Sequence, residues 1–360
     1  MTAIRVLVVD DSATMRGLIA LALRRDPEIE VVGTAGNPLT AREAIKEHNP
    51  DVITLDVEMP GMNGLDFLEK IVRLRPTPVI MVSNLTGQGT ETAIEAMQIG
   101  AVDCIAKPGP GDAEPFAELP NMIKAAARAR VRQRPMLNGD AKGRDQRRPL
   151  ISTYEPDGRL LAIGSSTGGV EALTTLISQL PENCPPTLIV QHMPADFTSS
   201  LAARLDRLNP QKVMEAHEGA PLEVGRIYIA PGGATHLEVE ESGGLRCRMR
   251  SSDPVNGHSP SVDVLFASVA QVAKSKAVGV ILTGMGRDGA DGLLAMRQAG
   301  ARTIGQDEAT SLIYGMPKVA FEIGAVERQL PLDRIATAVL VMTNLRGRQG
   351  RESKCHSQTN

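Results

Sequence analysis

The sequence predicts an α/β protein with two doubly wound parallel-sheet domains joined by a flexible linker. Short apolar segments alternate with helical patterns over residues 4–106, and the same alternation returns over residues 160–345. Between these regions, residues 135–158 contain Pro, Gly, Arg, Asp and Lys without an apolar period, as a linker does. Strands that alternate with helices favour a parallel sheet with helical crossovers on its faces.

The first region repeats a strand–helix unit five times. Its expected strands are short, rich in Val and Ile, and apolar at consecutive positions, which is typical of strands covered on both faces. They lie at residues 4–9, 31–34, 52–55, 79–82 and 104–106. Helical patterns separate them at residues 12–25, 38–48, 64–75 and 90–98, and a last helix is expected within residues 116–134. Ser12 is the expected N-cap of the first helix.

The second region alternates in the same way. Strands are expected at residues 160–164, 187–190, 226–230, 278–283 and 302–305, and helices at residues 169–180, 196–208, 262–273 and 289–298. A chain of 360 residues with 42 % apolar residues suits two domains, each with its own core. We expect a first domain over residues 1–125, a basic helix extension and linker over 126–158, a second domain over 159–348 and a polar tail over 349–360.

Charge and cysteine content exclude several classes of protein. The net charge is −3, but nine Lys and Arg against two Asp give residues 124–148 a local charge of +7. This basic run would be the contact surface of a DNA-binding regulator, but no helix-turn-helix pattern follows it, so we expect no nucleic-acid partner. The four cysteines are scattered without metal-ligand spacing. No signal peptide or membrane span is apparent, which favours a cytoplasmic protein.

Polar residues follow the strands of the first region at their carboxyl ends. Asp10 and Asp11 follow the first strand, and Asp56, Ser83 and Lys107 follow three others. A parallel sheet brings such residues to one edge. Three adjacent carboxylates repel one another, so we expect a hard cation such as Mg²⁺, together with Lys107, to neutralise them. An aspartate beside Mg²⁺ can accept a phosphoryl group, although a chance acidic cluster that caps helices is the alternative.

These residues resemble the receiver domain of response regulators, and the resemblance covers about residues 1–125. The matching motifs are the acidic pair, the run Leu-Asp-Val-Glu-Met-Pro-Gly-Met-Asn-Gly, a serine after the fourth strand and Lys-Pro after the fifth. The resemblance implies a flavodoxin-like fold in which Asp56 is phosphorylated. It further implies a Mg²⁺ site formed by Asp10, Asp11 and Asp56 with the backbone carbonyl of Glu58.

The same resemblance implies roles for the last two strand ends. Ser83 and Lys107 would contact the phosphoryl oxygens, and the peptide bond before Pro108 would be cis. One residue departs from the family pattern, because Cys104 stands at a switch position that is usually aromatic. Rotation of an aromatic ring is therefore not expected to relay the phosphorylation signal here.

A serine in a glycine-rich turn is the main candidate in the second region. Ser166 lies in Gly-Ser-Ser-Thr-Gly-Gly, after an expected strand and before an expected helix. Such a turn presents a hydroxyl beside backbone N–H groups that can bind an oxyanion. His192 ends the next strand, and Asp288 follows the strand at residues 278–283. A nucleophile, a base and an orienting acid would thus meet at one edge of one sheet.

The pattern alone leaves alternatives open. The glycine-rich turn is also typical of loops that bind phosphate or nucleotide, although no Lys follows it as in a Walker A loop. A non-catalytic module that holds an anionic ligand is therefore a second interpretation. Other residues compete for each role: Ser165 for the nucleophile, and His217, His236 and His258 for the base. Asp288 could instead cap a helix.

The whole chain resembles the chemotaxis protein-glutamate methylesterases, with the same motifs in the same order over residues 1–345. After the receiver these are Ile-Gly-Ser-Ser-Thr-Gly-Gly, Gln-His-Met-Pro, Ala-Pro-Gly-Gly, Ser-Val-Asp-Val-Leu-Phe and Leu-Thr-Gly-Met-Gly-Arg-Asp-Gly. The resemblance implies a Rossmann-like hydrolytic domain in which Ser166 is the nucleophile, His192 the base and Asp288 the orienting acid.

The resemblance also implies an activity, its partners and its control. Backbone N–H groups at Met285 and Thr167 would bind the oxyanion. The substrates would be glutamate γ-methyl esters on the cytoplasmic helices of chemoreceptors, with methanol released, receptor glutamines deamidated by many members, and no cofactor in the ester step. A chemotaxis histidine kinase would donate the phosphoryl group, and the unphosphorylated receiver would cover the Ser166 cleft. The protein would meet the membrane only through the receptors.

Overall fold

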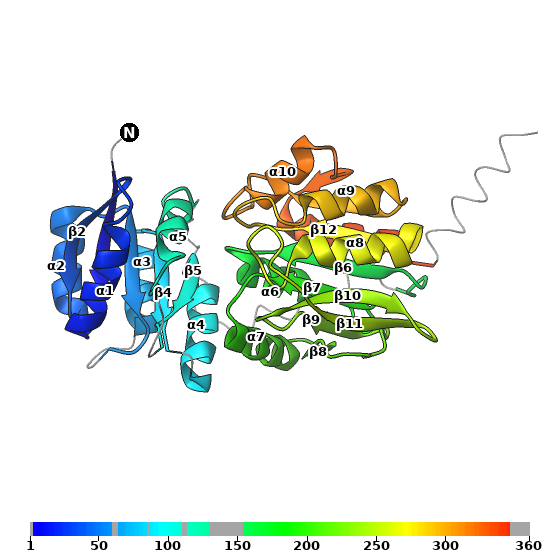
Figure 1. Ribbon diagram of the computed structural model, residues 1–360, viewed down its shortest axis with the longest axis horizontal. Helices are drawn as coiled ribbons and strands as arrows, with labels where there is room; N and C mark the ends of the chain where they lie inside the picture. The colour runs from blue at the N-terminus through cyan, green and yellow to red at the C-terminus, as the bar shows by residue number, and fades with distance from the viewer. Residues whose placement is uncertain (1–2, 60–63, 85, 110–113, 130–153, 346–360) are drawn as a thin grey trace, which may run out of the picture. The chain divides into compact units, whose positions relative to one another are not determined.

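The computed structural model describes residues 3–59, 64–84, 86–109, 114–129 and 154–345 (Figure 1). Its internal contacts divide the chain into two compact units, residues 1–137 and 138–360, and each unit is described by itself. Most of the predicted linker and the whole predicted tail lie outside the described residues. None of the helices that the model describes is long and apolar enough to cross a membrane.

The first unit contains a five-stranded parallel sheet, which confirms the predicted fold class. The strands are β1 (Ile4–Val9), β2 (Ile29–Ala35), β3 (Val52–Asp56), β4 (Val79–Ser83) and β5 (Asp103–Ala106). Their order is β2-β1-β3-β4-β5, so the winding of the chain reverses between β1 and β3. Doubly wound sheets bind ligands at this switch point, outside the carboxyl ends of the strands.

Helices cover both faces of this sheet. They are α1 (Ala13–Leu23), α2 (Pro38–His48), α3 (Gly64–Leu74), α4 (Gly87–Ile99) and α5 (Leu119–Ala126). The predicted N-cap of α1 is confirmed, since Ser12 Oγ accepts a hydrogen bond from Met15 N at 3.3 Å. The last helix is shorter than the pattern over residues 116–134: it begins after Phe116, whose φ of 62° lies outside the helical region. The basic residues after 129 lie outside the described part.

The second unit is built on a seven-stranded sheet in which every neighbouring pair is parallel. The strands are β6 (Leu160–Ser165), β7 (Thr187–Gln191), β8 (Lys212–Glu215), β9 (Arg226–Ile229), β12 (Ala277–Ile281), β13 (Arg302–Gln306) and β14 (Arg328–Leu330). Their order is β14-β13-β12-β6-β7-β9-β8. Strand β6 lies between β7 and β12, and the direction of winding reverses at β6, so the carboxyl ends of these three strands surround the switch point.

The helices of the second unit mostly match the expected pattern. They are α6 (Gly169–Ile177), α7 (Ala195–Leu208), α8 (Val262–Val272), the 3₁₀ turn η1 (Lys274–Lys276), α9 (Ala290–Gln298), α10 (Met316–Glu322) and α11 (Leu332–Met342). Strands β8 and β14 and helices α10 and α11 were not predicted. The two strands are three and four residues long and lie at the sheet edges, where exposure removes the apolar run that marks a buried strand.

An antiparallel hairpin is the largest element that the sequence analysis did not predict. It consists of β10 (Thr235–Glu241) and β11 (Leu245–Ser251), and it packs against α8 (Figure 1). Leu237 and Val239 are buried with the half-exposed Glu238 between them, so burial alternates over residues 237–240, although His236 is buried as well. Val239 N also donates to Ser268 Oγ of α8 at 3.0 Å.

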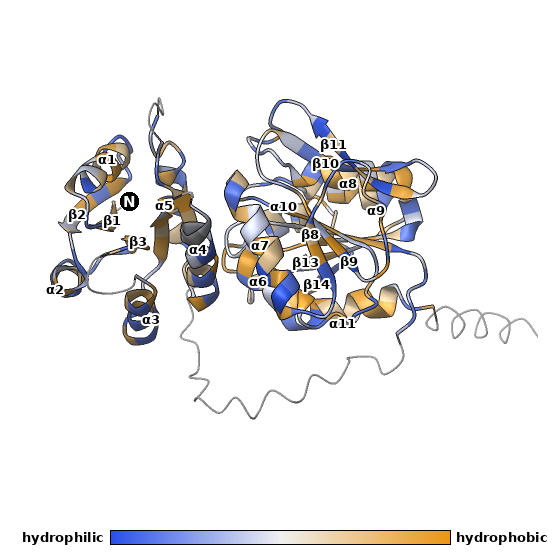
Figure 2. Cartoon of the chain, turned by 90° about the horizontal axis from the view of Figure 1, so that it is seen from below, coloured by the Kyte–Doolittle hydropathy of each residue, from blue (hydrophilic) through white to orange (hydrophobic). Residues whose placement is uncertain are grey.

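Each unit has a core of aliphatic side chains between its sheet and its helices, where the apolar residues gather in Figure 2. The central strands β3, β4 and β6 are buried along their whole length. With aromatics at only 2 % of the chain, Val, Leu, Ile, Ala and Met fill most of this space. Tyr228, Phe197 and Phe266 are fully buried aromatic residues of the second unit. The two covered sheets hold the strand ends in place as rigid edges.

Candidate functional site

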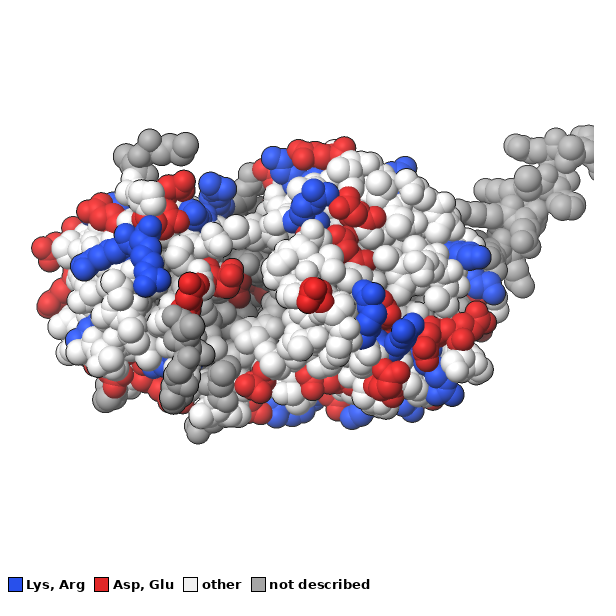
Figure 3. Space-filling view, viewed as in Figure 1, with Lys and Arg blue, Asp and Glu red and all other residues white. Residues whose placement is uncertain are grey.

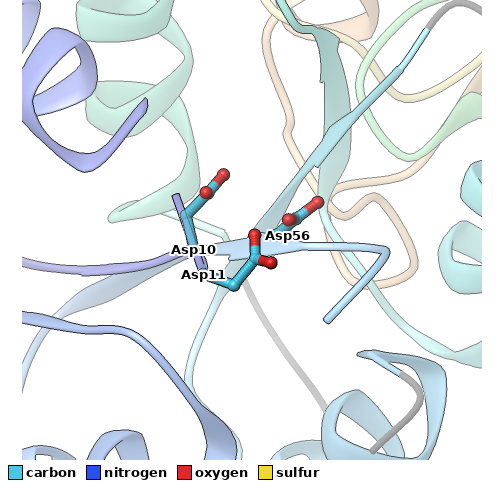
Figure 4. A group of neighbouring side chains, drawn as sticks. All are labelled: Asp10, Asp11 and Asp56. Carbon is cyan, nitrogen blue, oxygen red and sulfur yellow. The ribbon is translucent and has the colours of Figure 1, made fainter. Parts of the chain in front are cut away.

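The first candidate site lies at the switch point of the first sheet. Asp10 directly follows β1, Asp56 is the last residue of β3, and carboxylate oxygens of Asp10, Asp11 and Asp56 lie within 4.8 Å of one another. Figure 4 shows the three carboxyl groups gathered at these strand ends. Asp10 and Asp56 are buried, whereas Asp11 is exposed. Clustered carboxylate oxygens are the ligands that a hard divalent cation prefers, so these residues fit a metal ion.

Lys107 supplies part of the counter-charge for this cluster. Its Nζ lies 2.9 Å from Asp56 Oδ2 and 3.4 Å from Asp10 Oδ2. Burial raises the pKa of Asp56 to about 6; Lys107 opposes this rise and the neighbouring Asp10 adds to it. The pKa of Asp10 is also raised, chiefly by burial. Because one ammonium group does not compensate three carboxylates, the cluster retains a preference for a further cation.

Two other predicted residues of this site lie beside the cluster without completing it. Ser83 is the last residue of β4, and its hydroxyl donates to Gly89 O of α4 at 2.9 Å. No hydrogen bond joins Ser83 to Asp56 in the part of the chain that is described. Glu58 N donates to Asp56 Oδ1 at 3.2 Å, which places the Glu58 backbone next to the acidic cluster.

Two further expectations concern Cys104 in β5 and the peptide bond before Pro108. Cys104 is only 3 % exposed and has a free thiol, so the switch position is filled by a small buried side chain. The expected cis bond between Lys107 and Pro108 is wrong. Within the described residues, the cis peptide bond is the one between Ser259 and Pro260 in the second unit.

The second candidate site begins where β6 ends, at the switch point of the second sheet. Ser165 is the last residue of β6 and is fully buried, and its Oγ donates to Gln191 Oε1 at 2.7 Å. Ser166 follows it and retains 9 % exposure. Helix α6 begins three residues later at Gly169. Since the Ser165 hydroxyl is bound inside the protein, Ser166 is the serine of this turn that a substrate can reach.

The glycines and Gln191 hold this turn in its conformation. Gly168 has a φ of +78°, a left-handed conformation that favours glycine. A Cβ on Gly169 would lie 1.9 Å from Gln191 Oε1, so only glycine fits there. Gln191 Nε2 donates to Ser166 O at 2.9 Å and to His192 O at 3.0 Å. Gln191 therefore braces the serine turn against the end of β7, a role that its place before a histidine in the sequence does not reveal.

His192 and Asp288 form a direct pair at the same sheet edge. His192 Nε2 lies 2.8 Å from Asp288 Oδ2, and His192 N donates to Ser165 O at 3.1 Å. His192 Nδ1 is buried and has no hydrogen-bond partner among the described residues. Nor does a hydrogen bond join Ser166 Oγ to His192 within those residues, a contact that often tightens only when substrate binds. The pairing leaves Nδ1 as the nitrogen that is free to exchange a proton.

Several donors converge on the buried carboxylate of Asp288. These are Ser261 Oγ at 2.7 Å, Val262 N at 2.7 Å, Asn256 Nδ2 at 3.0 Å and Asp263 N at 3.3 Å. Ser261 is the N-cap of α8, so the positive end of this helix faces the carboxylate. Burial by itself would raise the pKa of Asp288, but hydrogen bonds from His192, Asn256 and Ser261 outweigh burial and hold this pKa well below its usual range.

The three competing histidines occupy different positions. His236 is fully buried, accepts a hydrogen bond from Ser261 N at 3.1 Å and packs within the hairpin region. His217 is exposed. The ring of His258 lies on the ring of His192, with centroids 3.7 Å apart. None of the three is hydrogen-bonded to Asp288 in the described part of the chain, so His192 is the histidine that the geometry selects.

The predicted oxyanion donors lie on either side of Ser166. Met285 is in the loop after β12, and its backbone N–H makes no hydrogen bond within the described residues. The same loop packs closely against the serine turn, since a Cβ added to Gly284 would lie 2.7 Å from Ser166 Cβ. Thr167 precedes α6, and its carbonyl accepts a hydrogen bond from Thr283 Oγ1 at 3.0 Å. The loop after β12 therefore brings the Met285 N–H close to Ser166, where it can donate to a reacting carbonyl.

The charged side chains of the second unit are interspersed in sign on the face shown in Figure 3. Ion pairs such as Arg287–Asp291 at 2.8 Å and Arg250–Glu238 at 3.0 Å account for part of this mixture. The basic run over residues 124–148 lies mostly outside the described residues.

An acidic site at one switch point and a histidine–aspartate pair beside a serine turn at another are typical of response regulators whose second unit is an enzyme. Residues 6–114 match the response regulator receiver domain, and residues 161–339 match the CheB methylesterase family. The chain is 60 % identical, over 96 % of its own length and 100 % of the relative's, to protein-glutamate methylesterase/protein-glutamine glutaminase 1 of Caulobacter vibrioides. The chain belongs to the CheB methylesterase family.

Other comparisons agree with this family. A protein-glutamate methylesterase/protein-glutamine glutaminase of Agrobacterium fabrum is 58 % identical, with 95 % of this chain and 97 % of that protein covered. The crystal structure of the Thermotoga maritima CheB methylesterase catalytic domain matches with a TM-score of 0.50 and 40 % identity. That match covers 51 % of this chain and 97 % of the solved chain, as expected when the solved domain corresponds to the second unit.

Proposed function

We propose that this chain is a phosphorylation-controlled hydrolase that removes methyl groups from glutamate γ-methyl esters on the cytoplasmic helices of chemoreceptors and also deamidates receptor glutamines. The observation that carries the proposal is the bonded His192–Asp288 pair against the Ser166 turn. The names of relatives that match over nearly their whole length supply the substrate class. Such an enzyme takes part in chemotactic adaptation.

The ester reaction proceeds by acyl transfer to serine. Ser166 Oγ attacks the ester carbonyl while His192 Nδ1 accepts its proton, and the protonated Nδ1 then delivers that proton to the departing methoxide, which leaves as methanol. Water attacks the glutamyl-enzyme with the same nitrogen as base, which releases the glutamate carboxylate and restores Ser166. With a glutamine substrate the leaving group is ammonia. Asp288 keeps Nε2 protonated throughout and stabilises the imidazolium.

The backbone N–H groups of Met285 and Thr167 are proposed to bind the oxyanion of the tetrahedral intermediate. The unbonded N–H of Met285 and the N-terminus of α6 beside Thr167 support this assignment. One such donor is worth about 3–4 kcal/mol of transition-state stabilisation. No cofactor is required for the ester step.

The first unit is proposed to control the second by phosphorylation of Asp56. Asp10, Asp11 and Asp56 with the Glu58 carbonyl would hold Mg²⁺, which supplies positive charge for the incoming phosphoryl group. Lys107 already lies 2.9 Å from Asp56 and would contact a phosphoryl oxygen. Ser83 would have to leave Gly89 O to do the same. The phosphodonor would be a chemotaxis histidine kinase, in the cytoplasm, and the enzyme would meet the membrane only through its receptors.

The decisive experiment measures methanol release from methylated chemoreceptor membranes by the full-length protein, with and without acetyl phosphate and Mg²⁺. Release that rises with the phosphodonor, and that Ser166→Ala abolishes, supports both the activity and its control. Release that ignores the phosphodonor contradicts the control alone. Absence of release under both conditions contradicts the esterase and favours a module that binds an anionic ligand or nucleic acid.

A truncated protein tests the direction of control. If the unphosphorylated first unit restrains the second, a fragment over residues 150–360 should release methanol faster than the unphosphorylated full-length protein. Equal rates would show that the first unit does not inhibit and that phosphorylation activates in another way.

A further inference from the structure

The face of the His192 ring carries a second imidazole that the proposed mechanism does not use. The rings of His192 and His258 are stacked, with centroids 3.7 Å apart and an interplanar angle of 13°. His258 lies in the segment between β11 and α8 and is half-buried. The edge of His192 is held by Asp288, so the stacked ring is a second, independent contact on the same side chain.

A tight turn fixes the position of His258. Val255 and His258 exchange two backbone hydrogen bonds, each of 3.0 Å, across Asn256 and Gly257. Asn256 and Gly257 have φ values of 54° and 80°, as in the type I′ turn that an Asn-Gly pair favours. The two hydrogen bonds of this turn hold the backbone of His258 against that of Val255.

The turn is also tied to the carboxylate that holds His192. Asn256 Nδ2 donates to Asp288 Oδ1 at 3.0 Å and to Asp263 Oδ2 at 2.7 Å. Because Asp288 receives both this amide and His192, one short turn fixes the edge and the face of the same imidazole. The hydrogen bond at Nε2 fixes one edge of the ring, and the stacked neighbour opposes a tilt of the ring plane.

We propose that His258 is a positioning residue, whose stacked ring fixes the plane of His192 so that Nδ1 stays directed at the reacting atoms beside Ser166. This inference rests on the proposed function. It makes His258 neither a second base nor a ligand: His258 has no hydrogen bond to Asp288, and it acts only through His192. His258 is one of the competing bases in the sequence pattern, and its stacked position in the structure points to another role.

His258 is uncharged when the enzyme works near neutral pH. Burial lowers the pKa of His258 to about 4, the neighbouring His192 lowers it further, and Asp288 opposes them. Besides His192 and Asp288, the carboxylate of Asp263 contacts the turn through Asn256. A neutral ring covers one face of His192 without adding a charge to the site.

The test compares two apolar replacements, one flat and one not, in the full-length enzyme activated by acetyl phosphate and Mg²⁺. H258F keeps a ring that can stack, whereas H258L fills similar space without a flat face. We expect H258F to keep kcat for methanol release within about twofold and H258L to lower it about tenfold with KM unchanged, since misorientation of a base acts on the chemical step.

H217L, at an exposed histidine of the same unit, is the matched control and should leave kcat unchanged. If H258L behaves like H217L, or if H258F loses as much activity as H258L, the stacked ring has no positioning role and the proposal is overturned. Should H258L fail to fold, H258Q, which also lacks an aromatic face, answers the same question. Failure of the wild type to release methanol, or release by Ser166→Ala, would instead refute the proposed function.

Discussion

Each unit holds a buried aspartate at the carboxyl edge of its parallel sheet, but the two aspartates lie in opposite electrostatic environments. Asp56 ends a strand beside the switch point of the first sheet, and burial raises its pKa to about 6. Asp288 follows a strand beside the switch point of the second sheet, and its hydrogen bonds hold its pKa well below the usual range. A place at the carboxyl edge of a parallel sheet therefore does not determine the chemistry of a carboxylate; the number of donors around it does.

The difference corresponds to two kinds of work. Asp56 shares Lys107 with Asp10, so its charge is only partly compensated, and a metal ion or a phosphoryl group can still improve the site. Asp288 receives hydrogen bonds from Ser261, the first turn of α8 and Asn256 in addition to His192. Its charge is compensated before any ligand arrives, which suits a residue that must orient a base without reacting.

Among the changes that test this comparison, removing the charge of Asp288 should have the largest effect on activity. Asp288→Asn keeps the shape but loses the anion that fixes His192 with Nε2 as donor, so methanol release should fall by about 10³–10⁴-fold. Phosphorylation of the first unit by radiolabelled acetyl phosphate should persist. Asp291→Asn, an exposed neighbour paired with Arg287, is the control and should be active. A Asp288→Asn enzyme with normal turnover would exclude Asp288 from the mechanism.

Removing one carboxylate of the acidic cluster should abolish the control by phosphorylation without changing ester hydrolysis itself. Asp11 is expected to be a direct ligand of Mg²⁺, so Asp11→Asn should weaken Mg²⁺ binding by at least about 10–100-fold. That range is typical when only an outer-shell partner of a metal ligand is lost. Stimulation of methanol release by acetyl phosphate should then disappear at ordinary Mg²⁺, while unstimulated release stays unchanged. The measurement is a Mg²⁺ titration of phosphorylation and of release, with Asp51→Asn as an acidic control elsewhere in the unit. Undiminished stimulation would place the metal elsewhere.

The raised pKa of Asp56 predicts a pH dependence of stability with a defined sign. The folded protein binds the Asp56 proton more tightly than the unfolded chain does, since the pKa rises from 3.8 to about 6. Its contribution to stability is therefore complete below pH 3.8 and is lost as the pH rises through about 6. In urea unfolding of the first unit without Mg²⁺, the free energy of unfolding of the wild type should fall relative to that of Asp56→Asn as the pH rises over this range. A constant difference between the two proteins would contradict the raised pKa.

The smallest effect should come from the buried serine of the catalytic turn. Ser165→Ala removes one hydrogen bond to Gln191 and should cost about 1 kcal/mol of stability while kcat stays within a few-fold. Ser166→Ala, one residue later, should abolish release with little change in thermal unfolding. Methanol release and the unfolding midpoint of the two variants separate the roles. Loss of activity in Ser165→Ala with activity retained in Ser166→Ala would reverse the assignment of the nucleophile.

Much of the fold could be predicted because its signals are local. Consecutive Val and Ile mark strands covered on both faces, and β1 matches the expected bounds while β3, β4 and β6 extend only one residue further. The sequence of the hairpin β10–β11 also alternates with a period of two. It was not predicted because the surrounding segments alternate between strand and helix. The edge strands β8 and β14 were missed because partial exposure removes their apolar runs.

The sequence by itself determined the two sheets and the residues at their carboxyl ends, because strand period and chain order place Asp10, Asp56, Ser166, His192 and Asp288 at switch points without any knowledge of contacts. Only the tertiary structure decided which serine hydroxyl is bound inside the protein, which donors surround Asp288 and which ring covers His192. Ser261 lies 27 residues from Asp288 along the chain. Contacts between such distant residues depend on how helices and loops pack over a sheet, and no local pattern records that packing.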